Sequence, residues 1–156
     1  MSANLQSETP CYRRMRSADL PQVLAIEEQV YDYPWTLGIL SDCLRVGYYC
    51  QIIEIDTQII AYSVMSVAVG ESHLLNLSVH PDWQKRGFGR RLLNNMLEYA
   101  RVKGATASFL EVRESNTRAI KLYLAQGYNQ VGIRTDYYPA RHGREDAIIF
   151  ALQIFR

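Results

Sequence analysis

The sequence predicts a three-layer α/β domain with a mixed, mostly antiparallel central sheet flanked by helices. Segments rich in β-branched and aromatic residues alternate with segments whose apolar residues recur at helical spacing, and short connections join them. The 156 residues allow one core of ordinary size, and no repeat, low-complexity tract or Gly/Ser linker divides them. We therefore expect a flexible start over residues 1–10 and a single domain over residues 11–156.

The N-terminal part is predicted to hold one strand and two helices. Residues 11–16 have the pattern of a short edge strand. An apolar stripe then follows a helical period over residues 20–30, with Ser17 as the expected N-cap. After an aromatic break at residues 31–35, Thr36 is expected to cap the second helix.

The rest of the chain is predicted to be mostly strands. Three strands come first, with a hairpin turn at residues 56–57, and they cover residues 48–55, 58–69 and 72–79. A glycine-containing polar stretch then opens a helix that ends near Lys103 and Gly104. The remaining strand, helix, strand and strand are expected at residues 106–112, 116–126, 128–137 and 145–154. The predicted order is therefore β-α-α-β-β-β-α-β-α-β-β.

Composition and charge exclude several classes of protein. The 17 basic and 16 acidic residues nearly cancel, which disfavours binding to nucleic acid by phosphate neutralisation. The longest mostly apolar stretch is too short to cross a bilayer, so no membrane association is expected. Three scattered histidines and three cysteines without a CxxC pair predict no metal site, reduced thiols and a cytoplasmic location.

The most informative stretch runs from a predicted strand into a helix. It reads Gln84-Lys85-Arg86-Gly87-Phe88-Gly89-Arg90. Glycines let a ligand approach the backbone, and the free N–H groups of a helix's first turn bind phosphate. A dinucleotide fingerprint would need a third glycine, where Leu92 stands, and a P-loop would need Gly-Lys-Ser/Thr. An ordinary strand-to-helix loop with solvated charges remains the alternative.

The motif Gln84-x-x-Gly87-x-Gly89, after Leu77-Ser-Val79-x-Pro81, resembles the acetyl-CoA motif of the Gcn5-related N-acetyltransferase (GNAT) superfamily. The resemblance covers about residues 11–154. It implies a bulged strand at residues 75–79 that splays from the strand at 106–112, with the pantetheine arm of acetyl-CoA in the gap and no metal. It also implies a set of cofactor-binding residues: Leu77, Ser78, Val79, Lys85, Arg86, Gly87, Phe88, Gly89, Arg90 and Asn116.

The C-terminal third resembles one group in that superfamily more closely. The matching stretches are Leu110-Glu-Val-Arg113, Ser115-Asn116, Leu122-Tyr123, Gly127-Tyr128, Tyr137-Tyr-Pro139 and Gly143-Arg-Glu-Asp-Ala-Ile148. The group is the bacterial ribosomal-protein-alanine N-acetyltransferases, RimI. This resemblance implies an acceptor partner, the N-terminal alanine of small-subunit ribosomal protein eighteen.

Two residues are candidates for proton transfer. An N-terminal amine has a pKa of about 7.7–8.0 and must lose a proton before it attacks a thioester. Strand alternation puts Glu111 on the face opposite Leu110, and the resemblance assigns it the base role. The resemblance assigns the acid role, protonation of the leaving thiolate, to Tyr123. The alternatives are an exposed carboxylate paired with a basic neighbour and a packed core tyrosine.

Four aromatic residues are candidates for the acceptor groove, because tyrosines combine an apolar body with a polar tip. They are Tyr33, Trp35, Tyr137 and Tyr138. Packing that pins a loop to the sheet is the alternative for each of them.

The sequence thus predicts an enzyme that transfers acetyl from acetyl-CoA directly to the α-amine of a ribosomal protein in a ternary complex. A relative that acts on another amine, such as a small metabolite or a lysine, is one alternative. A non-catalytic acyl-CoA-binding module is another, although the presence of both Glu111 and Tyr123 argues against it.

Overall fold

The structure, a computed structural model, describes residues 9–155 and contains one sheet in the order β1-β2-β3-β4-β5-β7-β6. Most of the predicted flexible start lies outside the described residues. The strands are β1 (Cys11–Arg14), β2 (Tyr49–Ile55), β3 (Gln58–Ala68), β4 (Glu71–Val79), β5 (Ala107–Arg113), β6 (Asn129–Ala140) and β7 (Gly143–Gln153). The helices are α1 (Leu20–Val30), α2 (Leu37–Arg45), α3 (Phe88–Val102) and α4 (Thr117–Gln126), with 3-10 turns η2 (Ser17–Asp19) and η3 (Pro81–Trp83). This order and the mixed α/β class confirm the sequence prediction.

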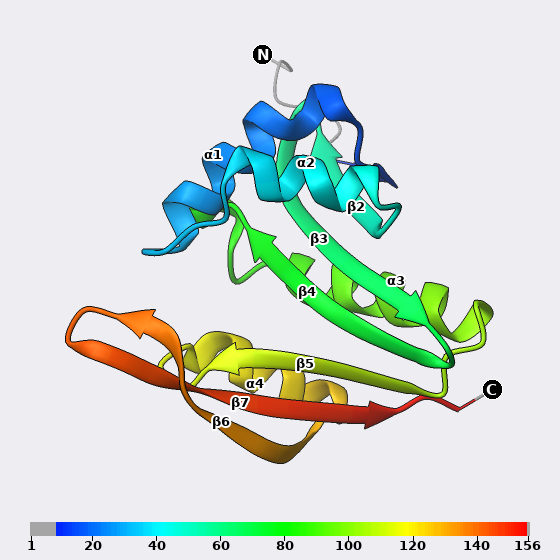
Figure 1. The fold of residues 1–156 in the computed structure, drawn as a ribbon. Helices are drawn as coiled ribbons and strands as arrows, with labels where there is room; N and C mark the ends of the chain where they lie inside the picture. The colour runs from blue at the N-terminus through cyan, green and yellow to red at the C-terminus, as the bar shows by residue number, and fades with distance from the viewer. Residues whose placement is uncertain (1–8, 156) are drawn as a thin grey trace.

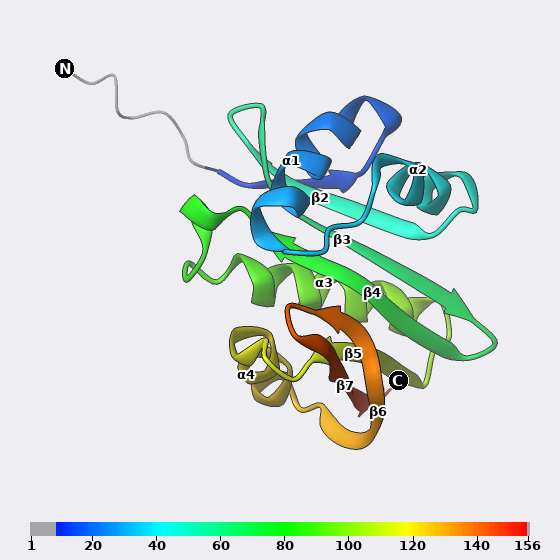
Figure 2. The same cartoon turned by 60° about the vertical axis from the view of Figure 1, so that its left-hand side comes forward.

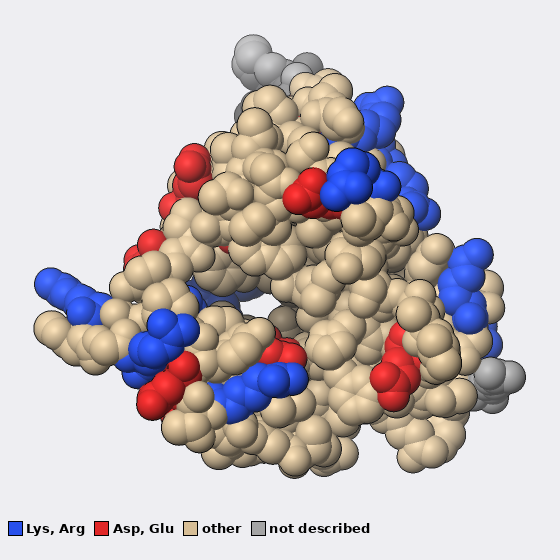
Figure 3. Space-filling model, in the orientation of Figure 1, with Lys and Arg blue, Asp and Glu red and all other residues tan. Residues whose placement is uncertain are grey.

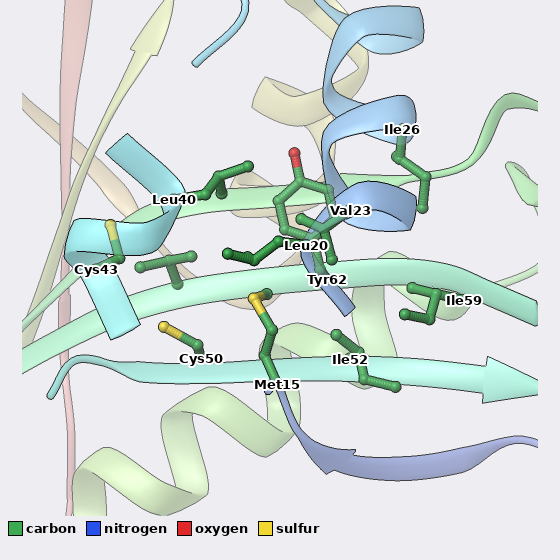
Figure 4. Close-up of a cluster of buried hydrophobic side chains, with 11 residues drawn as sticks. Met15, Leu20, Val23, Ile26, Leu40, Cys43, Cys50, Ile52, Ile59 and Tyr62 are labelled. Carbon is green, nitrogen blue, oxygen red and sulfur yellow. The ribbon is translucent and has the colours of Figure 1, made fainter. Parts of the chain in front are cut away.

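The helices cover the two faces of the sheet, as Figures 1 and 2 show. Alternate residues of β2 and β3 explain the layering, because successive side chains of a strand point to opposite faces. Ile52 and Tyr62 pack in a buried cluster with α1 and α2, whereas Ile53 and Ala61 pack with the start of α3. Figure 4 shows the first cluster, in which Cys43 and Cys50 are buried.

The sheet divides between β4 and β5. These strands are parallel and paired from Glu71 to Leu74 on one side and from Ala107 to Leu110 on the other. On its other edge, β4 pairs with β3 through a register shift that leaves Leu75 as an extra residue. Such a bulge bends its strand and increases the local twist. The expected bulge and splay are therefore confirmed, and beyond Leu110 the two strands diverge.

Local sequence explains most element boundaries. The hairpin residues Asp56 and Thr57 both have positive φ, 49° and 67°, as a two-residue turn between twisted strands requires. Thr36 caps α2 through its side-chain oxygen, which accepts from the N–H of Ile39 at 3.2 Å. Both features agree with the sequence prediction.

The predicted N-cap at Ser17 is wrong. Ser17 begins a 3-10 turn, and α1 starts only at Leu20. The reason is the carboxylate of Asp19, which accepts from the Arg16 N–H at 2.7 Å and from both terminal nitrogens of Arg13 at 2.8 Å. These bonds tighten the turn before the helix can begin.

We predict that Asp19→Asn destabilises the fold in a pH-dependent way. The Arg13 guanidinium holds the pKa of the Asp19 carboxyl below its ordinary value, against the opposing effect of burial. A lowered native pKa gives stability that is present above the ordinary Asp pKa of about 3.9 and lost as the pH falls through the native value. Urea unfolding at pH 7 should show a loss of about 1.5–3 kcal/mol.

The difference between wild type and Asp19→Asn should shrink in urea series run below pH 4. Asp42→Asn is the matched control, because its ion pair with Arg45 is 3.2 Å long but both side chains are mostly exposed. A gap between Asp19→Asn and wild type that stays constant down to pH 2 would contradict this account.

Candidate active site

A cavity of about 1070 Å³ lies where β4 and β5 diverge. Its walls come from the end of β4, the loop into α3, the start of α4, the α1–α2 loop and the tip of the β6–β7 hairpin. Figure 3 shows the hollow in the middle of the molecule, with acidic and basic side chains along its lower edge. The site is thus built on strand and helix ends brought together by the divided sheet.

The β4 wall presents backbone groups to the cavity. The Leu77 carbonyl accepts from the Tyr31 hydroxyl at 3.4 Å, and the Val79 carbonyl accepts from Gln84 Nε2 at 3.0 Å. Both carbonyls therefore point away from β3. In an extended strand the N–H and C=O of one residue point to the same edge, so the N–H groups of Leu77 and Val79 face the cavity as well. An extended ligand with amide groups could pair with this edge.

The start of α3 forms a second wall. Gly87 is the N-cap residue at φ 84°, and it offers no side chain to the first-turn N–H groups. Lys85 also has a positive φ of 65°, so the loop turns its backbone through two left-handed positions. Gly89 has no Cβ, and one added there would lie 3.5–3.9 Å from Leu77, Val79 and Leu122. These features suit the binding of a phosphate group.

Basic side chains surround that helix start. Lys85, Arg90, Arg118 and Lys121 line the cavity. Arg86 lies outside the lining, because its guanidinium stacks on the Trp83 ring at 4.8 Å. Of the predicted cofactor-binding residues, nine line the cavity: Leu77, Ser78, Val79, Lys85, Gly87, Phe88, Gly89, Arg90 and Asn116.

Asn116, the N-cap residue of α4, and Tyr123 within α4 both face the cavity. The Asn116 side chain accepts from the Ala119 N–H at 3.2 Å, so it caps the helix while it lines the cavity. Tyr123 is 6% exposed and also reaches the cavity wall. Burial raises the pKa of its phenol, and the neighbouring phenols of Tyr31, Tyr128 and Tyr138 act in the same direction. The hydroxyl therefore keeps its proton at neutral pH.

Glu111 lies at the dividing point of the sheet but outside the cavity lining. It follows Leu110, the last β5 residue paired with β4, and its side chain is on the face opposite the buried Leu110 and Val112, as predicted. Its carboxylate oxygens lie 3.6 Å from His73 Nε2 and 3.4 Å from Arg134 Nε. Pairing with basic neighbours, the alternative considered above, is thus part of its environment.

Tyr138 lies close both to Glu111 and to Arg113, which lines the cavity. Burial raises its pKa to about 12, with Glu111 among the groups that add to the rise. Arg113 stacks on the Tyr138 ring at 4.5 Å and on the Tyr33 ring at 5.3 Å. It also donates to the Pro139 carbonyl at 2.7 Å and to Glu145 Oε1 at 2.8 Å. Arg113 therefore ties the α1–α2 loop to the β6–β7 hairpin at the cavity mouth.

The four predicted acceptor-groove aromatics do not all reach the cavity. Tyr33 lines it, whereas Trp35, Tyr137 and Tyr138 do not. Trp35 packs against the α1–α2 core cluster. A register shift in β6 between Arg134 and Tyr138 breaks the strand alternation, so the rings of Tyr137 and Tyr138 meet edge to face, 4.9 Å between centroids.

Sequence reasoning missed Tyr31 and Glu27, as it missed Arg118 and Lys121 of the cavity lining. Tyr31 lines the cavity, and its hydroxyl lies 3.0 Å from Ser78 Oγ. Glu27 is 2% exposed and accepts from Asn76 Nδ2 and from the Trp35 N–H, each at 2.8 Å. The signal was available, because a carboxylate on the apolar stripe of α1 needs buried partners.

Within residues 9–155, no group of three or more His, Cys, Asp or Glu side chains could hold a metal ion. None of the helices described there has the length and apolarity to cross a bilayer.

Residues 6–128 match the acetyltransferase (GNAT) family. The chain belongs to this family. Its members use acetyl-CoA as the acyl donor, and the chain is accordingly an acetyl-CoA-dependent N-acetyltransferase. The predicted GNAT fold is also confirmed.

Individual GNAT proteins resemble the chain over nearly its whole length. It is 36% identical over 140 residues, 90% of this chain and 95% of the relative, to the [ribosomal protein bS18]-alanine N-acetyltransferase of Salmonella typhimurium. The crystal structure of the ribosomal-protein-S18-alanine N-acetyltransferase from Escherichia coli matches with a TM-score of 0.89 and 34% identity, covering 95% of this chain and 96% of that one. YncA of Salmonella typhimurium, solved with acetyl-CoA, shares the fold (TM-score 0.78, 18% identity, 94% and 95% covered).

We predict that Arg113→Lys loosens the cavity mouth. Lysine keeps the charge near Glu145 but cannot stack on both rings or present a planar fork of donors. Thermal or urea unfolding should show a loss of about 1–2 kcal/mol. Amide hydrogen exchange at the hairpin tip, residues 138–145, should speed up more than exchange elsewhere. Arg45→Lys, in an exposed ion pair, is the control and should change little. Unchanged tip exchange in Arg113→Lys would contradict the role given to Arg113.

Proposed function

We propose that this protein acetylates the N-terminal alanine of a small-subunit ribosomal protein, bS18, by direct attack of the α-amine on acetyl-CoA. The observation that supports it most is the cavity at the divided sheet, where the β4 edge and the open N-terminus of α3 meet. Relatives that align over 90% of the chain and carry the name of that activity support the choice of acceptor.

The cavity residues have separate parts in this proposal. The N–H groups from Lys85 to Arg90 bind the diphosphate, with charge added by Lys85 and Arg90. The peptide edge at Leu77 and Val79 pairs with the pantetheine arm and supplies an N–H to the developing oxyanion. Arg86, which stacks on Trp83, is the predicted contact that the cavity geometry supports least.

The transfer goes straight from the thioester to the amine. Among the residues that the structure describes, no cysteine lines the cavity. Burial raises the pKa of the Cys50 thiol to about 11, which removes its nucleophilic thiolate at neutral pH. A covalent acetyl-cysteine route is therefore not part of the proposal.

Glu111 is the proposed general base. Its carboxylate lies at the point where β4 and β5 separate, next to Tyr138 and on the face opposite the α3–α4 core. It accepts the proton of the α-ammonium through a bridging water, because it does not itself line the cavity. Tyr123, protonated and at the cavity wall, is the proposed acid for the leaving thiolate.

Tyr33 and the β6–β7 hairpin, which Arg113 joins, form the opening through which an acceptor peptide enters. Tyr138 contacts Arg113 at this opening, and Tyr137 packs against Tyr138. Trp35 serves this opening indirectly, since it anchors the α1–α2 loop in the core. We also propose that residues 11–156 act as one domain, and that the reaction takes place in the cytoplasm, where ribosomal proteins are made.

The deciding experiment is acceptor profiling by mass spectrometry with acetyl-CoA. A peptide with the N-terminal sequence of bS18 should be acetylated on its α-amine. The same peptide with a blocked N-terminus and a free lysine should not react. Acetylation of lysine or of small amines, with no reaction at the alanine, would overturn the proposed acceptor in favour of a different GNAT activity.

We predict that Glu111→Gln lowers kcat by about 10²–10⁴-fold, because the amide cannot accept the proton. Steady-state kinetics with the alanine-starting peptide measure this. The control is Glu98→Gln, whose carboxylate forms an exposed ion pair with Arg101 on α3. Normal turnover of Glu111→Gln would contradict the base role and would mean that Glu111 serves only to pair with His73 and Arg134.

We predict that Tyr123→Phe lowers kcat by a similar factor of about 10²–10⁴ without unfolding the protein. The phenyl ring keeps the edge-to-face contact with Tyr128, 5.7 Å between centroids, so circular dichroism and Tm should stay close to wild type. Near-normal turnover would assign Tyr123 to core packing alone.

A further inference from the structure

A chain of buried polar groups runs from α1 to the cavity wall. Glu27 accepts from Asn76 Nδ2 at 2.8 Å and from the Tyr62 hydroxyl, which Figure 4 shows at the edge of the core cluster. Ser78 Oγ donates to Asn76 Oδ1 at 2.8 Å and lies 3.0 Å from the Tyr31 hydroxyl. The chain crosses two strands and one helix and ends at a phenol that lines the cavity.

The carboxylate fixes the orientation of the Asn76 amide, and through it the acceptor that Ser78 finds in Asn76. An ionised carboxylate only accepts, so Asn76 must turn its NH₂ group to Glu27 and its oxygen to Ser78. Ser78 has a single hydroxyl proton and two acceptors within reach, Asn76 Oδ1 at 2.8 Å and the Tyr31 oxygen at 3.0 Å, so the Asn76 oxygen competes with Tyr31 for that proton. The Tyr31 hydroxyl donates its own proton to the Leu77 carbonyl at 3.4 Å.

The Tyr31 oxygen consequently presents lone pairs, and no proton, to the cavity. Burial raises the pKa of this phenol to about 12, so it stays neutral and cannot serve as a base at neutral pH. The charged and titratable groups that act on it are Glu27 and Arg113, and it in turn acts on Tyr123 and Tyr138. A neutral oxygen that only accepts is complementary to a ligand group with N–H donors.

We propose that Tyr31 contacts the acceptor directly, with its phenolic oxygen accepting a hydrogen bond from the acceptor's α-amino group, and that Glu27 is the positioning residue that keeps this oxygen an acceptor. The inference rests on the proposed function and adds the group that recognises the free amine. Tyr31 begins the α1–α2 loop that also carries Tyr33, and its hydroxyl lies against the β4 edge at Leu77. The amine is thus held where the sheet divides, beside Tyr123 and Tyr138.

Glu27 also fixes the α1–α2 loop. Its second oxygen, Oε2, accepts from the Trp35 N–H at 2.8 Å. One buried carboxylate therefore joins the α1–α2 loop to β3 and β4. A glutamine in its place could keep the Trp35 bond through its oxygen and donate to Tyr62 and to a flipped Asn76. The Asn76 NH₂ group would then face Ser78, so the Ser78 proton would have Tyr31 as its acceptor and would occupy a lone pair of the phenolic oxygen.

The test compares two peptides on the full-length enzyme by calorimetry. One starts with alanine, and the other is identical except that a propionyl group replaces the alanine and so lacks the amine. Tyr31→Phe should weaken binding of the amine peptide by about 10–100-fold, as expected for a lost hydrogen bond to a charged group. The same substitution should weaken binding of the desamino peptide and of acetyl-CoA by less than about twofold, because neither ligand uses this contact.

Glu27→Gln should likewise weaken binding of the amine peptide more than binding of the desamino peptide, although Glu27 does not line the cavity. A variant that merely destabilised the α1–α2 loop would weaken binding of both peptides. The matched control is Tyr128→Phe, which removes another buried hydroxyl, 2.7 Å from Ser108 Oγ and outside the cavity. It should lower Tm without changing either affinity.

The outcomes separate this inference from the proposed function. If wild type acetylates the alanine peptide but Tyr31→Phe weakens binding of both peptides by the same factor, weakens neither, or weakens binding of acetyl-CoA instead, the contact with the amine is wrong and the function stands. If Glu27→Gln matches wild type in binding, the positioning role is wrong. If wild type acetylates no α-amine, the proposed function fails and this inference fails with it.

Discussion

The site depends on one irregularity in the sheet, the extra residue Leu75 in β4. It bends β4 away from β5 after the Leu74–Leu110 pair, and the separation leaves the peptide groups of Leu77 and Val79 without a strand partner. Unpaired backbone groups inside a protein are costly unless something satisfies them. Here the side chains of Tyr31 and Gln84 cover the carbonyls. The divided sheet therefore creates both the cavity and a peptide edge that a ligand can use.

Two arrangements fix the walls of the cavity, one within the β1–β4 part and one between the two parts of the divided sheet. On the α1 side, the Glu27 carboxylate holds the Trp35 loop and Asn76 of β4 through buried hydrogen bonds. At the mouth, Arg113 joins Tyr33 to Tyr138 and Glu145. Burial alone would raise the pKa of Glu145, but hydrogen bonds from Arg113 and Ser115 lower it below the ordinary value. The carboxylate therefore stays ionised and keeps its partners at neutral pH.

Local patterns predicted the elements well because each has a local cause. The turn at Asp56–Thr57, the cap at Thr36 and the end of α3 before Gly104 depend on nearby residues alone. The glycine turn that we propose as the phosphate site was predictable for the same reason, since Gly87 and Gly89 act through their own backbone. The splay of β4 came only through resemblance, because a bulge is defined by pairing with a distant strand. Ser17 failed as a cap because Arg13 and Asp19 reshape the turn, and Tyr31 was missed because its partners lie some 46 residues away.

The most direct test of the account is a crystal structure of the enzyme with coenzyme A linked covalently to an alanine-starting peptide. The account predicts that the diphosphate lies on the N–H groups of residues 87–90 and that the pantetheine arm pairs with Leu77 and Val79. The peptide nitrogen should then lie within reach of one bridging water from Glu111. A diphosphate bound elsewhere, or a peptide nitrogen on the far side of the sheet from Glu111, would contradict it.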